Sequence, residues 1–327
     1  MLRSLSIIIP TKDRPNDLEA TVEGVFRQSL STTHLVIVDQ SQSNESQALV
    51  TKQYAEAPSP LRERLQLRYL RDPVVPGGGV ARNRGMEIAE GEIWLFLDDD
   101  VTLEPNFVEE LLTVYQQHPH VTGVSGIITN YERPPRAYRL WAFVFVRGPF
   151  HDERQPIYWK ADRLRNAAPI AVRKLGGGLM SFRADAIRAH RFDENLTGVS
   201  DGEDVDFCAQ LGPDAVLMIA PRARLAHKAS PVGRTRDHWL RRFARANHYL
   251  YHRNWARGFR NGLAFVWLNV GLGLAALLAC ARRASLAPWR ALREGTHEGT
   301  RVALPRPMTD CRAHQATTGR ARFGWRL

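Results

Sequence analysis

The first hundred residues alternate short apolar runs with longer polar stretches, and no other feature constrains the fold as strongly. Three apolar runs, Leu5–Pro10, Leu35–Asp39 and Leu65–Leu70, have the length of buried strands. The segments Asp17–Gln28 and Ser46–Glu56 between them have the length and polarity of surface helices. Strands that alternate with helices predict an α/β fold with a mostly parallel sheet flanked by helices.

A glycine-rich turn and a fourth strand complete this pattern. The turn, Pro76–Arg84, leads into a short helix over Arg82–Ala89, and the strand Ile93–Asp100 (IWLFLDDD) ends in three carboxylates. Ligands of such sheets bind beyond the carboxyl ends of the strands. Polar clusters follow three of the strands, at Thr11–Arg14, Asp39–Ser43 and Asp98–Asp100. The sequence therefore predicts a site at this edge, whereas GGGVAR, which follows the third strand, does not fit a GxGxxG dinucleotide turn.

The three consecutive carboxylates predict a metal site. Unit charges about 4 Å apart repel by about 1 kcal/mol even in bulk water, and a divalent cation relieves this repulsion. Strand alternation places Asp98 and Asp100 on one side and Asp99 on the other. Such oxygen ligands suit Mg²⁺ or Mn²⁺. The alternative is a solvated loop whose aspartates cap the next helix, which we expect over Glu104–His118.

The pattern of residues 101–233 is mixed. A strand is expected over Val121–Thr129, and the segments Leu175–Arg183 and Ala215–His227 return the chain towards a cleft. Between them, Tyr131–Pro169 is an aromatic, proline- and arginine-rich excursion, which we interpret as a loop over an acceptor site. The triplet Gly176–Gly178 indicates either a close approach of the backbone to a ligand or a turn.

Five segments together resemble a known domain. They are SIIIPTKDRP, LVIVDQS, GGGVARNRGMEIAEGEIWLFLDDD, GGGLMSFRADAI followed by RFDENLTG, and GEDVDFCAQL. In order and spacing they resemble the GT-A (Rossmann-like) nucleotide-sugar-binding domain of family-2 inverting glycosyltransferases, over about residues 4–230. The resemblance implies a transferase that binds a nucleoside diphosphate sugar through Mg²⁺ or Mn²⁺ and inverts the anomeric centre in one displacement.

The resemblance also implies which residues contact the nucleotide sugar. They are Pro10, Thr11, Asp13, Asp39, Arg82, Asn83, Asp98, Asp99 and Gly177. In this set Asp39 accepts from the imide N–H of a pyrimidine, Asp98 reaches the ribose, and Arg82 contacts nucleotide or phosphate. Such domains often continue the second strand with Asp-Gly-Ser, whereas this chain has Gln40 and Ser41 after Asp39.

Metal ligands and a general base follow from the same comparison. The implied metal ligands are Asp100, Asp98 and His227, a neutral imidazole being an acceptable ligand. The acceptor hydroxyl must lose a proton as it attacks, which requires a carboxylate base. The resemblance favours Asp204 as this base, with Glu203 as acceptor binder or alternate base.

The neighbouring polar residues have simpler interpretations. We interpret Asp201 and Asp206 as a helix cap and a first-turn acid that complements the helix dipole. For Arg234 two readings stay open, closure over a diphosphate or contact with a membrane.

The excess positive charge of the chain is confined to its C-terminal part. The net charge is +11, but residues 1–233 carry 27 basic and 30 acidic groups. Residues 234–260 carry eight arginines and one acid, and residues 282–327 carry ten arginines and three acids. Between them Gly262–Ala281 is an uncharged run of 20 residues. This order predicts an anionic membrane surface as partner and no nucleic acid.

The apolar run is flanked by arginines on both sides, which disfavours a simple span. We therefore favour a re-entrant or interfacial helix, with His238–Arg260 as a basic-aromatic interfacial helix. A buried helix of a soluble protein is the alternative. The tail, residues 282–327, is expected to be poorly ordered. The three cysteines are dispersed and the chain has no signal-like start, so we expect the catalytic part to be cytoplasmic.

The predicted organisation has three parts. They are a GT-A domain over 1–233, a membrane-associating region over 234–281 and a tail over 282–327. The expected function is transfer of a sugar from a UDP or dTDP sugar to a hydroxyl of a lipid-linked glycan or polysaccharide, at the cytoplasmic face of the cell membrane. The alternatives are a nucleotidyltransferase, which also uses carboxylate-bound Mg²⁺, and a non-catalytic membrane-bound scaffold that binds cations.

Overall fold

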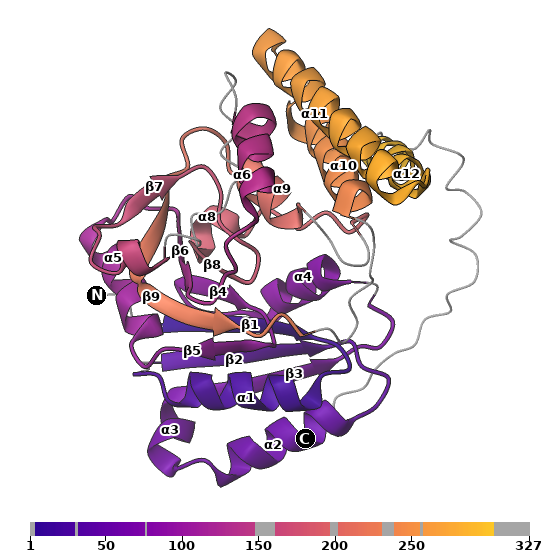
Figure 1. The fold of residues 1–327 in the computed structure, drawn as a ribbon. Coiled ribbons are helices and arrows are strands. Elements are labelled where there is room, and N and C mark those ends of the chain that lie inside the picture. The colour runs from indigo at the N-terminus through magenta and orange to yellow at the C-terminus, as the bar shows by residue number, and fades with distance from the viewer. Residues whose placement is uncertain are drawn as a thin grey trace, which may run out of the picture.

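The computed structural model describes residues 4–29, 32–75, 77–147, 161–196, 202–230, 239–255 and 258–303. It has two layers, a sheet with its own helices and a group of C-terminal helices beside it (Figure 1). Most of the buried apolar side chains belong to one core around the sheet.

The N-terminal half of the sheet is parallel, as the alternating pattern predicts. Its strands are β1 (Ser4–Thr11), β2 (Thr32–Asp39), β3 (Leu65–Arg71) and β4 (Ile93–Leu97), in the spatial order β3-β2-β1-β4. The helices between them are α1 (Pro15–Phe26), α2 (Glu45–Glu56), α3 (Ser59–Arg64) and α4 (Gly78–Ile88). Helices α1 and α2 lie on one side of the sheet and α4 on the other (Figure 1). The isoleucines of β1 are therefore buried on both faces of the strand.

The remaining strands make the sheet mixed. They are β5 (Val101–Leu103), β6 (Gly123–Ile128), β7 (Ile170–Val172), β8 (Leu179–Arg183) and β9 (Leu217–His227). Strand β8 runs antiparallel between β4 and β6, β9 pairs parallel with β6, and β5 and β7 pair antiparallel with β9. The helices of this part are α5 (Phe107–Gln117), α7 (Ala161–Leu164), α8 (Ala184–Ile187) and α9 (Glu203–Gln210).

Strand β4 ends at Leu97, so the three carboxylates lie in the turn after it. Because β5 starts at Val101 and pairs with the end of β9, this turn is held against the last residues of β9. Val101 is directly opposite His227 in that pairing. Two segments separated by more than a hundred residues thus meet at the carboxyl edge of the sheet.

The second layer contains three long helices and part of the 131–169 excursion. The long helices are α10 (Trp239–Leu250), α11 (Phe259–Arg283) and α12 (Ala287–Ala303), with a π-helical turn over Tyr251–Trp255. Against them pack α6 (Arg136–Ala142) and a second π-helical turn, Phe143–Arg147. Residues 136–147 of the excursion are therefore helical and cover α11, and residues 148–160 lie outside the described residues.

The tail departs from its prediction. Ala287–Ala303 forms α12, which packs along α10, so the expectation of poor order is wrong for this segment. Its glycines explain the packing, because a Cβ at Gly295 or Gly299 would overlap the carbonyl oxygen of Arg241 or Arg245. Residues 304–327 lie outside the described residues.

Within the described part of the chain, one helix is both long enough and apolar enough to cross a membrane, and this helix is α11. It includes the whole uncharged run from Gly262 to Ala281 and extends it at both ends. Its most hydrophobic stretch has a mean hydropathy of 2.1, and only 22% of that stretch is buried.

Candidate functional site

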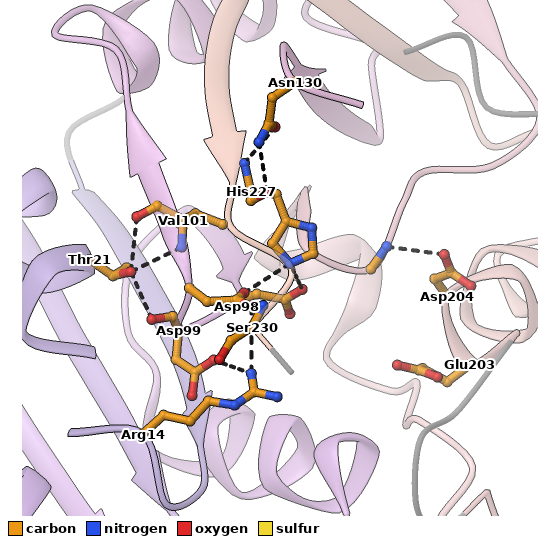
Figure 2. Close-up of polar contacts among 12 residues, drawn as sticks. Arg14, Thr21, Asp98, Asp99, Val101, Asn130, Glu203, Asp204, His227 and Ser230 are labelled. Carbon is orange, nitrogen blue, oxygen red and sulfur yellow. Dashed lines mark hydrogen bonds and ion pairs between the residues drawn. The ribbon is translucent and has the colours of Figure 1, made fainter. Parts of the chain in front are cut away.

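Two carboxylates and an imidazole converge at the carboxyl edge of the sheet. Asp98, Asp100 and His227 each offer one ligand atom, and these atoms lie within 4.8 Å of one another. The Nε2 atom of His227 is 2.9 Å from Asp100 Oδ1 and 3.7 Å from Asp98 Oδ2. Figure 2 shows the imidazole pointing at the carboxylates from the end of β9. A divalent cation with a mixed oxygen and nitrogen preference, such as Mn²⁺, fits this set.

The surrounding backbone orients the cation cluster of Asp98, Asp100 and His227. Ser230 donates its N–H to Asp100 Oδ2 at 2.8 Å. Asn130 exchanges two hydrogen bonds of 2.9 Å with the backbone of His227 (Figure 2). Burial opposes ionisation of Asp100, but the contacts with His227 and Ser230 outweigh it and lower the pKa of Asp100. The cluster is thus built to keep this carboxylate charged, as a metal ligand must be.

Asp99 points away from the cluster, although it lies in the turn after β4 and strand alternation does not apply there. It accepts a hydrogen bond of 2.7 Å from the Thr11 hydroxyl and one of 2.9 Å from Arg14. Only 4% of Asp99 is exposed, and burial raises its pKa to about 6. Asp99 therefore joins β1 to the turn, and its contact with the nucleotide sugar stays a prediction.

Arg82 joins the cation cluster to the acids of α9. Its guanidinium donates to Asp98 Oδ1 at 3.1 Å and to Glu203 Oε1 at 2.9 Å. The side chain is 6% exposed and lies against the ring of Phe192. Burial opposes its charge, but Glu203 and Asp98 outweigh that effect and raise the pKa of Arg82. Arg82, the predicted contact of nucleotide or phosphate, is thus a buried cation that lies between two carboxylates.

The candidate base lies at the first turn of α9. Glu203 is the first residue of this helix and Asp204 the second, after Gly202, whose φ of 109° is in the left-handed region. Asp204 Oδ2 accepts from the N–H of Gly177 at 3.0 Å, and its Oδ1 accepts from Val205 N–H at 2.8 Å. Asp204 is half-buried whereas Glu203 is buried. Of the two, Asp204 is therefore the more accessible to solvent.

The glycine triplet after β7 provides room for both acid groups. A Cβ on Gly178 would lie 2.6 Å from Asp98 Oδ2, and one on Gly177 would lie 3.5 Å from the Cβ of Asp204. The carbonyl of Gly178 also accepts from the N–H of Asp98 at 3.2 Å. Gly177 and Gly178 form a turn, in which the N–H of Leu179 donates to the carbonyl of Gly176 at 3.3 Å, and this turn passes close to the two carboxylates. The turn interpretation therefore applies here, and approach to a ligand stays a prediction.

The nucleoside-side residues surround the ends of β1 and β2. Asp39 is fully buried and accepts from the Tyr69 hydroxyl at 2.7 Å and from Ser41 N–H at 2.8 Å. Burial, with the negative charge of Asp39, raises the pKa of Tyr69. Asp13, whose φ of 54° is in the left-handed region, donates its N–H to the Ser41 hydroxyl. Pro10 and Thr11 are buried at the end of β1.

Asn83 connects α4 to a distant segment of the chain. It is 2% exposed, and its amide exchanges two hydrogen bonds of 2.9 Å with the backbone of Phe192. Its second amide hydrogen is donated to Glu194 Oε1 at 3.0 Å. Asn83 thus joins α4 to the segment before α9, and its contact with the nucleotide stays a prediction.

Three residues with simpler interpretations remain, namely Asp206, Asp201 and Arg234. Asp206 is buried and accepts from Asn254 and from Gln210, so it fixes the start of α9 to the C-terminal helices. The interpretation of Asp206 as an acid that complements the helix dipole therefore does not include its contact with Asn254. Asp201 and Arg234 lie outside the described residues.

Three contributors to the site were not singled out from the sequence. Arg14 reaches both Asp99 and Asp100, at 2.9 and 3.7 Å. Ser230 and Asn130 act on the cation cluster from loops that only the folded chain brings there. Arg14 belongs to the SIIIPTKDRP segment, so its motif could have identified it, whereas nothing local distinguishes the other two.

Comparisons with known proteins agree with this geometry. The family model described as glycosyl transferase family 2 matches residues 6–186, more than half of the chain. An uncharacterized glycosyltransferase of Haemophilus influenzae is 28% identical over 120 residues, which are 37% of this chain and 37% of the relative. The uncharacterized glycosyltransferase YibD of Escherichia coli K12 is 30% identical over 110 residues, 34% and 30% of the two chains. The chain thus matches only about a third of the length of these relatives.

Solved structures share the fold at low sequence identity. The S. aureus TarS 1–349 structure in complex with UDP-GlcNAc has a TM-score of 0.59 at 13% identity, covering 92% of this chain and 82% of that one. The mannosyltransferase PcManGT from Pyrobaculum calidifontis, in complex with GDP-Man and Mn²⁺, has a TM-score of 0.55 at 17% identity, covering 91% and 84%. These similarities confirm the GT-A fold for the sheet.

Proposed function

Because the chain belongs to glycosyl transferase family 2, we propose that it is a metal-dependent, inverting glycosyltransferase. In this proposal it moves a hexosyl or deoxyhexosyl group from a nucleoside diphosphate sugar, with UDP or dTDP as the expected nucleotide. The acceptor is a hydroxyl of a lipid-linked glycan or polysaccharide. One observation carries the proposal, namely that a cation cluster and a helix-borne carboxylate pair face one site and are joined by Arg82.

The donor side rests on the cation cluster. Asp98, Asp100 and His227 are the residues that would hold Mg²⁺ or Mn²⁺, and the metal would supply a Lewis acid for the leaving diphosphate. The buried guanidinium of Arg82 lies next to this position and adds positive charge where negative charge develops. Asp39 and Asp13, at the ends of neighbouring strands, remain the proposed nucleoside contacts.

The acceptor side rests on α9. We assign the general base to Asp204, because it is more accessible than Glu203 and its two N–H contacts fix its orientation. The acceptor hydroxyl gives its proton to this carboxylate as it attacks the anomeric carbon. Attack from the side opposite the leaving group inverts that carbon. Glu203, held by Arg82, is the proposed acceptor contact.

The position of α9 supports a membrane-associated acceptor. Asn254, in the turn after α10, donates to Asp206 of α9 at 2.8 Å, and the hydroxyl of Tyr249 in α10 donates to Asp193 at 2.7 Å. The helix that carries the proposed base is therefore bonded to the layer that contains the apolar helix α11. An acceptor anchored in lipid at the cytoplasmic face would approach α9 from that layer.

Calorimetric titration of the detergent-purified protein tests the donor side. We expect UDP or dTDP to bind with Mn²⁺ at least about tenfold more tightly than without it, and GDP to bind more weakly than either. The variant Asp100→Asn is the control and should lose the metal-dependent part of binding. Equal binding with and without metal would contradict the proposal. In turnover assays a glycosyltransferase releases a nucleoside diphosphate, whereas release of pyrophosphate from a nucleoside triphosphate would identify a nucleotidyltransferase.

A further inference from the structure

One face of α11 is apolar and exposed. Its side chains are between 39% and 60% exposed and follow one side of the helix: Leu263, Val266, Val270, Leu274, Leu277 and Leu278. We call this set the apolar stripe. At 1.5 Å per residue it is about 23 Å long. Large contiguous apolar surfaces of this kind mark interaction sites.

The opposite face of α11 is bonded to the rest of the protein. Asn269, the strongly polar residue of the apolar run, accepts through its Oδ1 from Nε2 of His248 in α10 at 2.9 Å. The indole N–H of Trp141 donates to the carbonyl of Gly271, and that of Trp267 donates to the carbonyl of Val144. The polar groups are thus turned inward, and the stripe contains apolar side chains alone.

These inner contacts are incompatible with a helix that crosses the bilayer. A span would bring the neighbours of α11 to hydrocarbon depth together with it. His248 contacts α11 directly, and the same layer of helices contains the ion pair between Arg241 of α10 and Glu298 of α12. Charged groups at that depth cost several kcal/mol each, as an order of magnitude. A helix lying in the membrane plane leaves these groups on the aqueous side.

The charges around the stripe identify its partner. Arg260 precedes it and Arg282 and Arg283 follow it, all three exposed, and residues 259–286 contain no acid. A second copy of the chain would place arginines opposite arginines, whether the two helices ran parallel or antiparallel. Anionic lipid headgroups at both ends of an apolar patch satisfy both features.

We propose that α11 is an in-plane membrane anchor, whose apolar stripe enters one leaflet of an anionic bilayer while both of its ends stay on the same side. This inference deepens the proposed function, because it specifies the surface from which a lipid-linked acceptor reaches α9. It concerns lipid binding, which can be measured without any sugar transfer, so it can fail while the proposed function stands.

Co-sedimentation of the full chain with vesicles tests the anchor. The vesicles contain phosphatidylcholine alone or phosphatidylcholine with about 30 mol% phosphatidylglycerol, which makes their surface anionic. We expect preference for the anionic vesicles, and a loss of about tenfold or more in affinity for Val270→Gln/Leu274→Gln. The matched control is Val74→Gln, since Val74 is 86% exposed in the turn after β3. Unchanged binding of the double variant, or no binding of the wild type, would overturn the proposal.

Labelling of the helix ends separates an in-plane helix from a span. A cysteine replaces Arg260 or Arg283 in a background of Cys280→Ser and Cys311→Ser, with the buried Cys208 left as the baseline. Protein added to preformed vesicles is treated with a membrane-impermeant maleimide. Labelling at both positions supports the proposal, and protection of one end demonstrates a span and overturns it. A stripe that forms a dimer in sedimentation velocity and binds no vesicles would also overturn it.

Discussion

The cation cluster and the acid pair of α9 consist of similar side chains, but their charges are balanced differently. In the cluster, ligand atoms of Asp98, Asp100 and His227 converge on one point. In the pair, Glu203 is already bonded to Arg82, and Asp204 accepts from two backbone N–H groups. Asp98 shares the guanidinium of Arg82 with Glu203, but Asp98 and Asp100 also lie next to the imidazole of His227, a side chain that can ligate a metal. The number of carboxylates therefore does not distinguish the two groups, whereas the imidazole beside one of them does.

The largest expected effect concerns Asp204. Replacement by Asn keeps a hydrogen-bonding oxygen but removes the base, so kcat should fall by about 10² to 10⁴. Affinity for the nucleotide with Mn²⁺ should change less than about twofold, because the cation cluster is untouched. Single-turnover kinetics and calorimetry on the same preparation check both expectations. A parallel loss of nucleotide affinity would show that the two acid groups do not have separate functions.

Removal of Arg82 tests the connection between the groups. Arg82→Met leaves Glu203 and Asp98 close together without their shared cation, and breaking such a buried ion pair costs about 3–5 kcal/mol. Urea denaturation should show this loss in the free energy of unfolding. Arg82→Met/Glu203→Gln should recover part of it, since one of the two stranded charges is then removed. A double variant as unstable as the single one would contradict the proposed charge balance.

Asp99 and Asp100 are adjacent, but only Asp100 is a proposed metal ligand. Asp100→Asn should raise the Mn²⁺ concentration needed for half-maximal nucleotide binding by about 10-fold to 100-fold. Asp99→Asn, the adjacent position in the same turn, should leave that concentration nearly unchanged, because Asp99 faces Thr11 and Arg14. Metal titrations monitored by calorimetry compare the two variants. Similar losses in both would assign Asp99 to the metal as well.

The smallest expected effect is the pH dependence of Asp99. Burial raises its pKa from 3.8 to about 6 in the folded protein. Between these values the folded state binds more protons than the unfolded state, so this group's contribution to stability falls as pH rises. Between pH 4 and pH 6 this group should lower the free energy of unfolding of the wild type by about 1–3 kcal/mol, and Asp99→Asn should remove that decrease. Urea denaturation in EDTA measures it, and identical slopes for variant and wild type would contradict the raised pKa.

The sheet and the position of the proposed ligands Asp98 and Asp100 after β4 were largely predictable from the sequence for local reasons. Apolar runs place the strands near their observed bounds, although Asp98–Asp100 lie in a turn where the sequence predicts the end of a strand. His227 required the family resemblance, because its contact with Asp100 depends on the pairing of β5 with β9. That pairing joins residues that are far apart in the chain and leaves no local pattern.

The sequence does not reveal the contacts of a polar residue whose partner is distant in the chain. The amide of Asn83 is used by the backbone of Phe192, 109 residues later, which its own motif does not reveal. In the same way, Arg-rich composition suggested a poorly ordered tail, yet the spacing of Gly295 and Gly299 lets α12 pack closely on α10. Composition describes a segment alone, whereas these roles depend on the surface that it meets.

The close packing of α12 on α10 also limits how this part of the chain can change in length. Gly295 and Gly299 lie one helical turn apart and face the carbonyls of Arg241 and Arg245, which are also one turn apart. One residue inserted between Ala287 and Gly295 would rotate both glycines by about 100° and bring side chains against α10. We therefore expect that the first half of α12 does not tolerate the insertion of a single residue, although several of its residues are charged or exposed.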